Sequence, residues 1–106
     1  MGIDYSTCVG EGFVISYEEF EELREQYPDV LEDNDYITYV NCYYSDTDIF
    51  VGPCKGFEAF EPKELNDLRD AISLEEHDAF MKWIREEGKN IFGERKISFM
   101  IFTHMY

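Results

Sequence analysis

The stretch from Tyr36 to Cys54 constrains the fold of this chain more than any other part. Its sequence, YITYVNCYYSDTDIFVGPC, contains two runs rich in β-branched and aromatic residues, which favour a pleated, half-buried strand. The residues between the two runs have polar side chains that favour a turn: Ser45, Asp46, Thr47 and Asp48. The stretch therefore predicts a β-hairpin. Because an isolated hairpin is marginally stable in water, the rest of the chain must supply elements that pack on it.

Strands are also predicted at both ends of the chain. Residues Met1 to Ser16 form the first strand, and Arg95 to Tyr106 form the last, with apolar residues on both faces that predict burial on both sides. The first strand contains the motif G-E-G at Gly10 to Gly12. This motif is too short for a phosphate-binding loop, and we interpret it as a bulge or a close approach of two backbones.

Helical patterns separate these strands. Ser16 to Gln26 predicts a helix because Ser16 and Glu19 match a capping box, and a narrow apolar stripe recurs at helical spacing at Phe20, Leu23 and Tyr27. Residues 28–35 are predicted to form a loop. Its polar cluster does not match a calcium-binding loop, because the glycine and glutamate that such a loop needs are missing. Further helices are predicted over Lys63–Ile72 and Leu74–Glu87.

The second of these helices has clear end signals. Ser73 and Glu76 match another capping box, and Gly88 stands where a helix commonly ends. The order is therefore strand, helix, hairpin, helices, strand. This order predicts an α+β fold over residues 1–106, a single small domain with an antiparallel sheet and its helices on one face. The strand order that fits best is the βαββαβ, ferredoxin-like one, in which the first and third strands are central.

Charge is the property that bears most on function. The chain has 24 acidic and 9 basic residues, a net charge of -15. Residues 1–61 contain 15 of the acidic residues, with Arg24 and Lys55 as their only basic ones. Such a surface disfavours direct binding to nucleic acid or to an anionic membrane, and it favours a basic protein as partner. The alternative is that the acidity serves solubility alone.

No metal or cofactor site and no catalytic motif is predicted. The 3 cysteines do not form a C-x-x-C pair, and their spacing does not match that of a zinc site. We expect them to be free thiols in a reducing compartment, and we expect no signal peptide and no membrane span. The predicted location is therefore the cytoplasm.

Three segments carry a resemblance to a known group of proteins. The opening G-I-D-Y-S, the following G-E-G-F-V-I-S and the hairpin strand Y-V-N-C-Y resemble short uncharacterised proteins that tailed bacteriophages encode. The resemblance implies a phage accessory protein that acts in the host cytoplasm. It is a group that includes anti-restriction and anti-CRISPR inhibitors, many of them small, acidic and without enzymatic activity. It assigns no functional residue.

Our first hypothesis is a non-enzymatic binding protein whose carboxylates cover a basic, nucleic-acid-binding surface of a host protein. Glutamates at repelling i, i+4 spacings on the first helix cost some stability, so fold stability alone would not select them. The candidate partner-binding residues are Glu18, Glu21, Glu22, Glu25, Glu32, Asp33, Asp35, Asp46 and Asp48.

Two other hypotheses remain open. The first is a small ligand-binding domain or enzyme that uses a pocket beside the sheet with His104 or a cysteine. The second is a module that forms a homo-oligomer through the tyrosine-rich hairpin. Tyrosine combines apolar area with a hydrogen-bonding tip, as interfaces favour, and four tyrosines crowd one predicted strand: Tyr36, Tyr39, Tyr43 and Tyr44.

Overall fold

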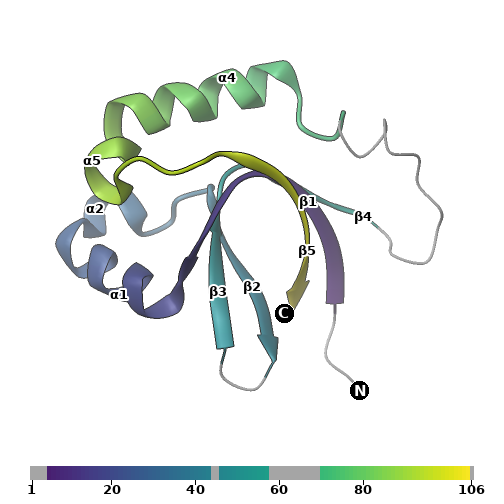
Figure 1. The fold of residues 1–106 in the computed structure, drawn as a ribbon, viewed down its shortest axis with the longest axis horizontal. Helices are drawn as coiled ribbons and strands as arrows, with labels where there is room; N and C mark the ends of the chain where they lie inside the picture. The colour runs from purple at the N-terminus through teal and green to yellow at the C-terminus, as the bar shows by residue number, and fades with distance from the viewer. Residues whose placement is uncertain (1–4, 44–45, 58–69, 106) are drawn as a thin grey trace.

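The structure is a computed structural model that describes residues 5–43, 46–57 and 70–105 (Figure 1). It confirms the α+β class, with an antiparallel sheet of five strands accompanied by helices. The strands are β1 Tyr5–Ser16, β2 Ile37–Tyr43, β3 Asp46–Val51, β4 Cys54–Phe57 and β5 Ser98–Met105. The helical segments are α1 Tyr17–Gln26, α2 Pro28–Leu31, α4 Leu74–Trp83, the π-helical turn η1 Ile84–Gly88 and α5 Lys89–Phe92.

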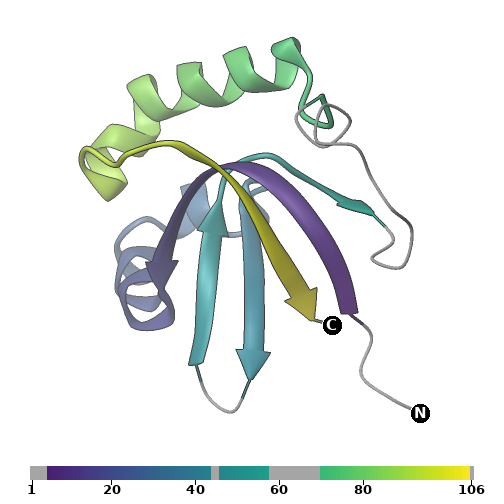
Figure 2. The same cartoon turned by 45° about the vertical axis from the view of Figure 1, so that its right-hand side comes forward.

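Strand β1 is the centre of the sheet, and all of its pairings are antiparallel. Its second half pairs with β3, from Phe13 opposite Val51 to Ser16 opposite Asp48. Its first half pairs with β4 on the side where its second half pairs with β3. On the other side, residues 5–12 of β1 pair with β5. Strand β2 pairs with β3 and completes the sheet, which is strongly curved (Figure 2).

The exact ferredoxin-like order is not confirmed. As expected, β1 and β3 are neighbours and β2 lies beside β3. However, the sheet has a fifth strand, β4, which also pairs with β1. The second hairpin strand ends at Val51, and after Gly52 and Pro53 the chain continues along β1 as a separate strand, which we did not predict.

The G-E-G motif lies where β1 meets the junction of β3 and β4. A Cβ atom on Gly12 would stand 1.9 Å from the carbonyl oxygen of Val51, and one on Gly10 would stand 2.7 Å from the Phe50 ring. Gly52, between β3 and β4, has a φ of 149°, a conformation that favours glycine. A Cβ atom there would stand 2.1 Å from the Glu11 carbonyl oxygen. The predicted close approach of two backbones is therefore confirmed.

The hairpin is confirmed, but its turn is shorter than we predicted. Strand β3 begins at Asp46, so Asp46, Thr47 and Asp48 are strand residues rather than turn residues. Pairing with β2 explains this difference, because Tyr43 stands opposite Asp46 and Val40 opposite Asp48, with an irregularity in the register between these two pairs. Residues 44–45 are outside the described part of the chain.

One hydrophobic core holds the sheet and the helices together. The helices pack on one face of the β1–β3 pair, as predicted, and the buried residues of this core are Phe13, Ile15, Phe20, Leu31, Ile49, Val51, Phe80, Ile91 and Phe92. Phe50 points to the opposite face, where it is fully buried and its ring lies 4.5 Å from that of Phe102. Both faces of β3 are therefore buried from Ile49 to Val51.

The helix starts follow the sequence signals more closely than the helix ends. Ser16 caps α1, and its Oγ accepts a hydrogen bond from the Glu19 amide at 3.2 Å. The Glu19 carboxylate does not complete the predicted capping box, because it binds Arg95 instead. Ser73 and Glu76 do form a complete capping box at the start of α4. Residues 28–31, predicted as part of a loop, form the helical turn α2 with Pro28 at its start.

The long helix does not end at Gly88, contrary to our prediction. Gly88 is buried inside the helix with a φ of -62°, and the chain continues through α5. The helix ends at Gly93, whose φ of 74° is the conformation that favours glycine. Of the predicted helix Lys63–Ile72, residues 63–69 lie outside the described part, and residues 70–72 form a turn and bend before α4.

Strand β5 is less buried than the sequence suggested. Phe99 is 41% exposed and Ile101 is 57% exposed, so the described part of this face of β5 is open to solvent. The predicted burial of both faces is wrong because, within the described residues, the helices pack over the β1–β3 half of the sheet and leave this side of β5 uncovered. No helix in the described part of the chain is long and apolar enough to cross a membrane.

We predict that Gly12→Ala lowers the free energy of unfolding by about 1–3 kcal/mol, because the added methyl group meets a backbone carbonyl that cannot move alone. Urea denaturation measures this change. The matched control is Gly88→Ala. There the nearest atom, at 2.8 Å, is the end of the flexible Ile84 side chain, and alanine gains about 1 kcal/mol in helix propensity. Equal destabilisation by the two substitutions would contradict this account of the close approach between β1 and the junction of β3 and β4.

Candidate functional site

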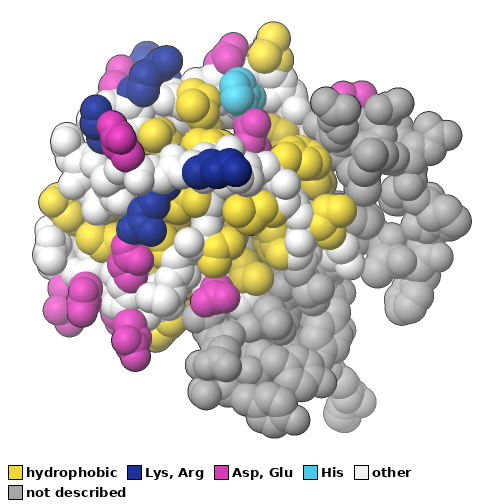
Figure 3. Space-filling view, in the orientation of Figure 1, with side chains coloured by type: hydrophobic (Ala, Val, Ile, Leu, Met, Phe, Trp, Pro, Cys, Tyr) yellow, Lys and Arg dark blue, Asp and Glu magenta, His cyan; other side chains and the backbone are white. Residues whose placement is uncertain are grey.

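The first helix presents a row of carboxylates to solvent. Its apolar side packs on the core through Phe20, which leaves Glu18, Glu22 and Glu25 exposed on the opposite side. Within the described part of the chain, none of these three carboxylates has an ion-pair partner. Acidic side chains gather over α1 at the lower left of Figure 3. They remain candidates for binding a partner.

Glu21 differs from the other candidate residues of this helix. It is half-buried, and its Oε2 accepts a hydrogen bond from Arg24 Nη2 at 2.7 Å. The Arg24 guanidinium in turn lies over the Phe20 ring, 5.8 Å from its centroid. Hydrogen bonding to Glu21, with the negative charge of that carboxylate, raises the pKa of Tyr17. Because Glu21 is engaged within α1, it is less available to a partner than its neighbours.

The loop after α2 holds the next group of candidates. Glu32, Asp33 and Asp35 are all exposed, and Asp33 has a φ of 56°. Asn34 fixes this loop, because its Nδ2 donates to the Val30 carbonyl at 2.9 Å and its Oδ1 accepts from the Tyr36 amide at 2.8 Å. Our sequence reasoning missed the role of Asn34, although an asparagine just before a strand is a common signal for such a turn.

A hollow of about 360 Å³ joins the helix to this loop. Its floor includes the buried residues Phe20 and Leu31, and Glu32 and Asp33 lie at its side. The full lining is Phe20, Arg24, Leu31, Glu32, Asp33, Asn34, Ile37 and Tyr39. The two acidic segments that the sequence singled out are therefore brought to the same end of the molecule, beside α1 and α2 in Figure 1.

The hairpin contributes one further exposed carboxylate. Asp48 is exposed and stands opposite Ser16, the residue that caps α1. The side chain of Asp46 lies outside the described part of the structure. We define the acidic end as the exposed members of the predicted partner-binding set: Glu18, Glu22, Glu25, Glu32, Asp33, Asp35 and Asp48.

The two hairpin tyrosines whose side chains the structure describes, Tyr36 and Tyr39, have different surroundings. Tyr36 packs inward, with its ring 5.0 Å from that of Phe80 and 5.2 Å from that of Trp83. Tyr39 is 39% exposed and lies 6.4 Å from the Tyr17 ring. The side chains of Tyr43 and Tyr44 lie outside the described part, as do those of His104 and Cys42. Of the described cysteines, Cys8 is buried, and the Cys54 sulfur lies 3.5 Å from the Thr38 hydroxyl.

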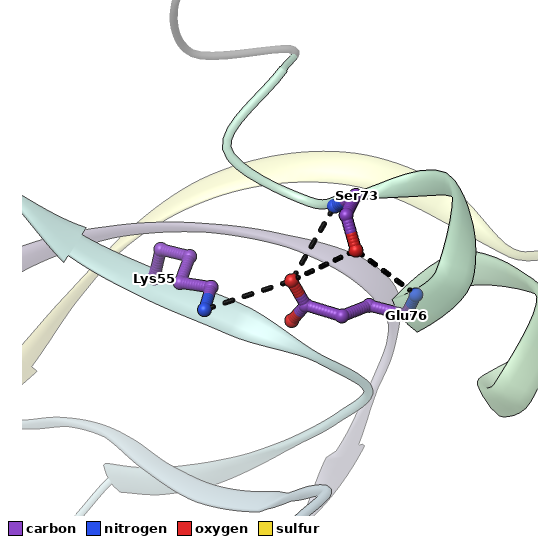
Figure 4. A network of polar contacts seen from close by, with 3 residues as sticks. All are labelled: Lys55, Ser73 and Glu76. Carbon is purple, nitrogen blue, oxygen red and sulfur yellow. Dashed lines mark hydrogen bonds and ion pairs between the residues drawn. The ribbon is translucent and has the colours of Figure 1, made fainter.

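A second polar cluster, which the sequence did not reveal, lies at the start of α4. The carboxylate of Glu11, which lies between the two glycines of β1, accepts a hydrogen bond from His77 Nδ1. Nearby, Glu76 contacts two residues: it completes the Ser73 capping box, and its Oε1 lies 3.6 Å from Lys55 Nζ on β4 (Figure 4). Among the described residues no group of three or more metal-ligating side chains is present.

The pair of His77 and Glu11 should make stability depend on pH. The hydrogen bond with Glu11 raises the pKa of His77 above 6.5, partial burial lowers it, and the negative charges of Glu11 and Asp78 raise it further. A histidine with a raised pKa in the folded chain contributes its full stabilisation below pH 6.5 and loses it as the pH rises through the raised value.

We therefore predict that His77→Gln lowers the unfolding temperature most at a pH below 6.5, and less once the pH exceeds the raised pKa. A pH series of thermal unfolding on parent and variant checks this difference. The control is Glu11→Gln, in which the pKa of His77, followed by NMR, should fall back toward its ordinary value. A pKa of His77 at or below 6.5 in the parent protein would contradict the prediction.

No family model, no curated protein and no solved structure matches this chain, so the candidate site rests on its own geometry.

Proposed function

We propose that this protein is a non-enzymatic binding protein whose acidic end covers a basic, nucleic-acid-binding surface of a host protein. In this proposal it acts as an inhibitor of the kind that tailed bacteriophages encode. The observation that carries the proposal is the exposure of the α1 carboxylates Glu18, Glu22 and Glu25, which make no ion pair within the described residues. Carboxylates in this state are available to lysine and arginine side chains of a partner.

The loop after α2 supports the same proposal. Glu32, Asp33 and Asp35 are exposed on a backbone that Asn34 holds by two hydrogen bonds. A carboxylate on a fixed backbone loses less conformational freedom on binding than one on a mobile loop, and this lowers the cost of association. The acidic end therefore combines charge with a defined arrangement, and solubility alone does not need the second property.

The hollow beside this loop gives the acidic end a place for an anchoring side chain. Its floor of Phe20 and Leu31 is apolar, and Glu32 and Asp33 border it. Arginine and lysine side chains bury their apolar stems on such surfaces while their charged heads reach carboxylates. The positive charge of Arg24 at the same hollow is balanced by Glu21, at 2.7 Å. The net charge that a partner meets there is therefore negative.

Electrostatic attraction predicts the kinetics of such a complex. A net charge of -15 steers a basic partner toward the protein, so association should be fast at low salt and slower as salt screens the attraction. The same charge should exclude DNA and RNA as direct ligands. A protein that occupies a nucleic-acid-binding surface should also displace the nucleic acid from it.

We predict that the triple variant Glu18→Gln, Glu22→Gln, Glu25→Gln keeps its fold and displaces DNA less effectively. The assay follows a fluorescent DNA duplex bound to each of a panel of purified basic DNA-binding proteins, and measures its release as our protein is added. The parent should release the duplex from at least one member. The triple variant should need about tenfold more protein, because each exposed contact with a basic group contributes about 0.2–1 kcal/mol.

The matched control is Glu86→Gln, Glu87→Gln, Glu94→Gln, which removes the same charge from exposed positions of η1 and the segment before β5. Its glutamines preserve an acceptor for the Trp83 indole, which donates to Glu87 at 3.0 Å. If both triple variants displace the duplex equally well, total charge rather than the acidic end is responsible. Failure of the parent to displace DNA from any member of the panel would remove support for the proposal.

A further inference from the structure

A second hollow lies far from the acidic end, where α4 begins. It measures about 310 Å³ and is formed by Glu11 of the G-E-G motif in β1, the turn before α4, the first turn of α4 and the start of β5. Its lining residues are Glu11, Asp70, Ile72, Ser73, Leu74, His77 and Phe99. This volume is at the lower limit for small-molecule pockets, about 300–1,000 Å³, and it suits one or two side chains of a protein partner better than a cofactor.

The apolar part of this hollow is unusually exposed. Leu74 is 74% exposed, and Phe99 is 41% exposed directly opposite Glu11 in the sheet. Ile101, two residues further along the same face of β5, is 57% exposed. The apolar surface in the centre and upper right of Figure 3 includes this region. Half of the large hydrophobic residues that are exposed in the described part therefore gather at one place. Such clustering marks an interaction surface more often than isolated exposed residues do.

The polar groups of the hollow select the chemistry of its occupant. His77 Nδ1 is hydrogen-bonded to Glu11. The Nε2 of the same ring can therefore donate a hydrogen bond to an acceptor of the partner, such as a peptide carbonyl. Asp70 lines the hollow and is exposed, and it makes no ion pair among the described residues. Glu75 and Asp78 are exposed on the first turns of α4, while the nearby Lys55 is already held by Glu76. The rim is therefore negative around an apolar centre.

We propose that this hollow is a second protein-binding site, and that it takes an apolar side chain of a partner segment next to a lysine or arginine. The apolar side chain packs on Leu74 and Phe99, and the basic side chain reaches Asp70. This combination, an anchored apolar group within a polar rim, is how a few residues dominate the affinity of many interfaces. The proposal does not depend on the acidic end, which is formed by different elements.

The charge of the chain argues against other occupants. A second copy would bring another net charge of -15 against a rim that is itself acidic, so self-association through this hollow is opposed by repulsion. Nucleic acid and anionic membranes are opposed for the same reason. A basic, apolar protein segment is the class of partner that satisfies both the charge and the exposed hydrophobic side chains.

The test uses NMR spectra of the full chain labelled with ¹⁵N and three acetylated, amidated peptides. The probe is Ala-Lys-Leu-Phe-Lys-Ala. The comparison peptides are Ala-Glu-Leu-Phe-Glu-Ala, which keeps the apolar residues, and Ala-Lys-Ser-Ser-Lys-Ala, which keeps the charge. The expected result is that only the probe shifts the backbone amides of Leu74, His77 and Phe99. The charged but polar peptide should shift amides of the acidic end instead.

Variants link these shifts to the hollow. Leu74→Ser and Phe99→Thr change exposed side chains, and each should weaken the affinity for the probe by about tenfold. The matched control is Val14→Thr, which also makes an exposed strand residue polar but lies outside the hollow, and which should bind the probe as the parent does. If one variant loses the dispersed spectrum of a folded chain, the other provides the test.

Three results with the peptides would overturn the proposal. They are equal shifts with the acidic apolar peptide, an absence of shifts at the hollow even at millimolar probe, and unchanged affinity of the probe for Leu74→Ser or Phe99→Thr. Shifts of the same amides on simple dilution of the protein, without peptide, would identify a second copy as the occupant and would equally overturn it. None of these results bears on the displacement of DNA by the acidic end, so the two proposals fail separately.

Discussion

The close crossing of β1 with the junction of β3 and β4 is the constraint on which the rest of the structure depends. Gly12 and Gly52 allow the two backbones to approach to distances at which any Cβ atom would overlap a carbonyl oxygen. On one side of this contact β1 pairs with β3, and on the other side it pairs with β4 and β5. Glu11, between the two glycines of β1, is then positioned to meet His77 at the start of α4.

The helices are fixed to this bent sheet mainly by the core, and polar contacts set their orientation. Phe20, Leu31 and Phe80 are almost fully buried, and side chains of this size contribute about 1.5–3 kcal/mol each when removed from water. Exposed ion pairs contribute less, about 0–1 kcal/mol. Arg95 shows what they add: it binds Glu19 of α1, donates to the Phe92 carbonyl at 2.9 Å and lies over the Phe13 ring. It therefore connects the end of α5 with α1 and β1.

The features that the sequence predicted correctly depend on neighbouring residues. The cap at Ser16, the capping box at Ser73 and the hairpin strands all follow from local patterns. The burial of Gly88 within the helix, and the exposure of Phe99 and Ile101, depend instead on which surfaces of the helices and the sheet pack together. In the acidic end, the exposed stripe Glu18, Glu22 and Glu25 follows from helical spacing. The hollow beside Glu32 and the pair of Glu11 and His77 required knowledge of contacts between distant segments.

In the described part of the folded chain, only some of the acidic residues of the first half form ion pairs with basic residues. Arg95, from the less acidic second half, reaches Glu19 on α1, and Arg24 holds Glu21. The remaining carboxylates of α1 repel one another at i, i+4 and i+3 spacings, so neutralising them should leave the fold unchanged or slightly more stable. Added salt should likewise leave the fold unchanged or slightly more stable, because it screens this repulsion. The same salt should weaken binding to a basic partner, because it also screens that attraction. A surface that serves only solubility has no attraction to lose. Opposite effects of salt on stability and on partner binding are therefore the physical sign that distinguishes a binding surface from a solubilising one.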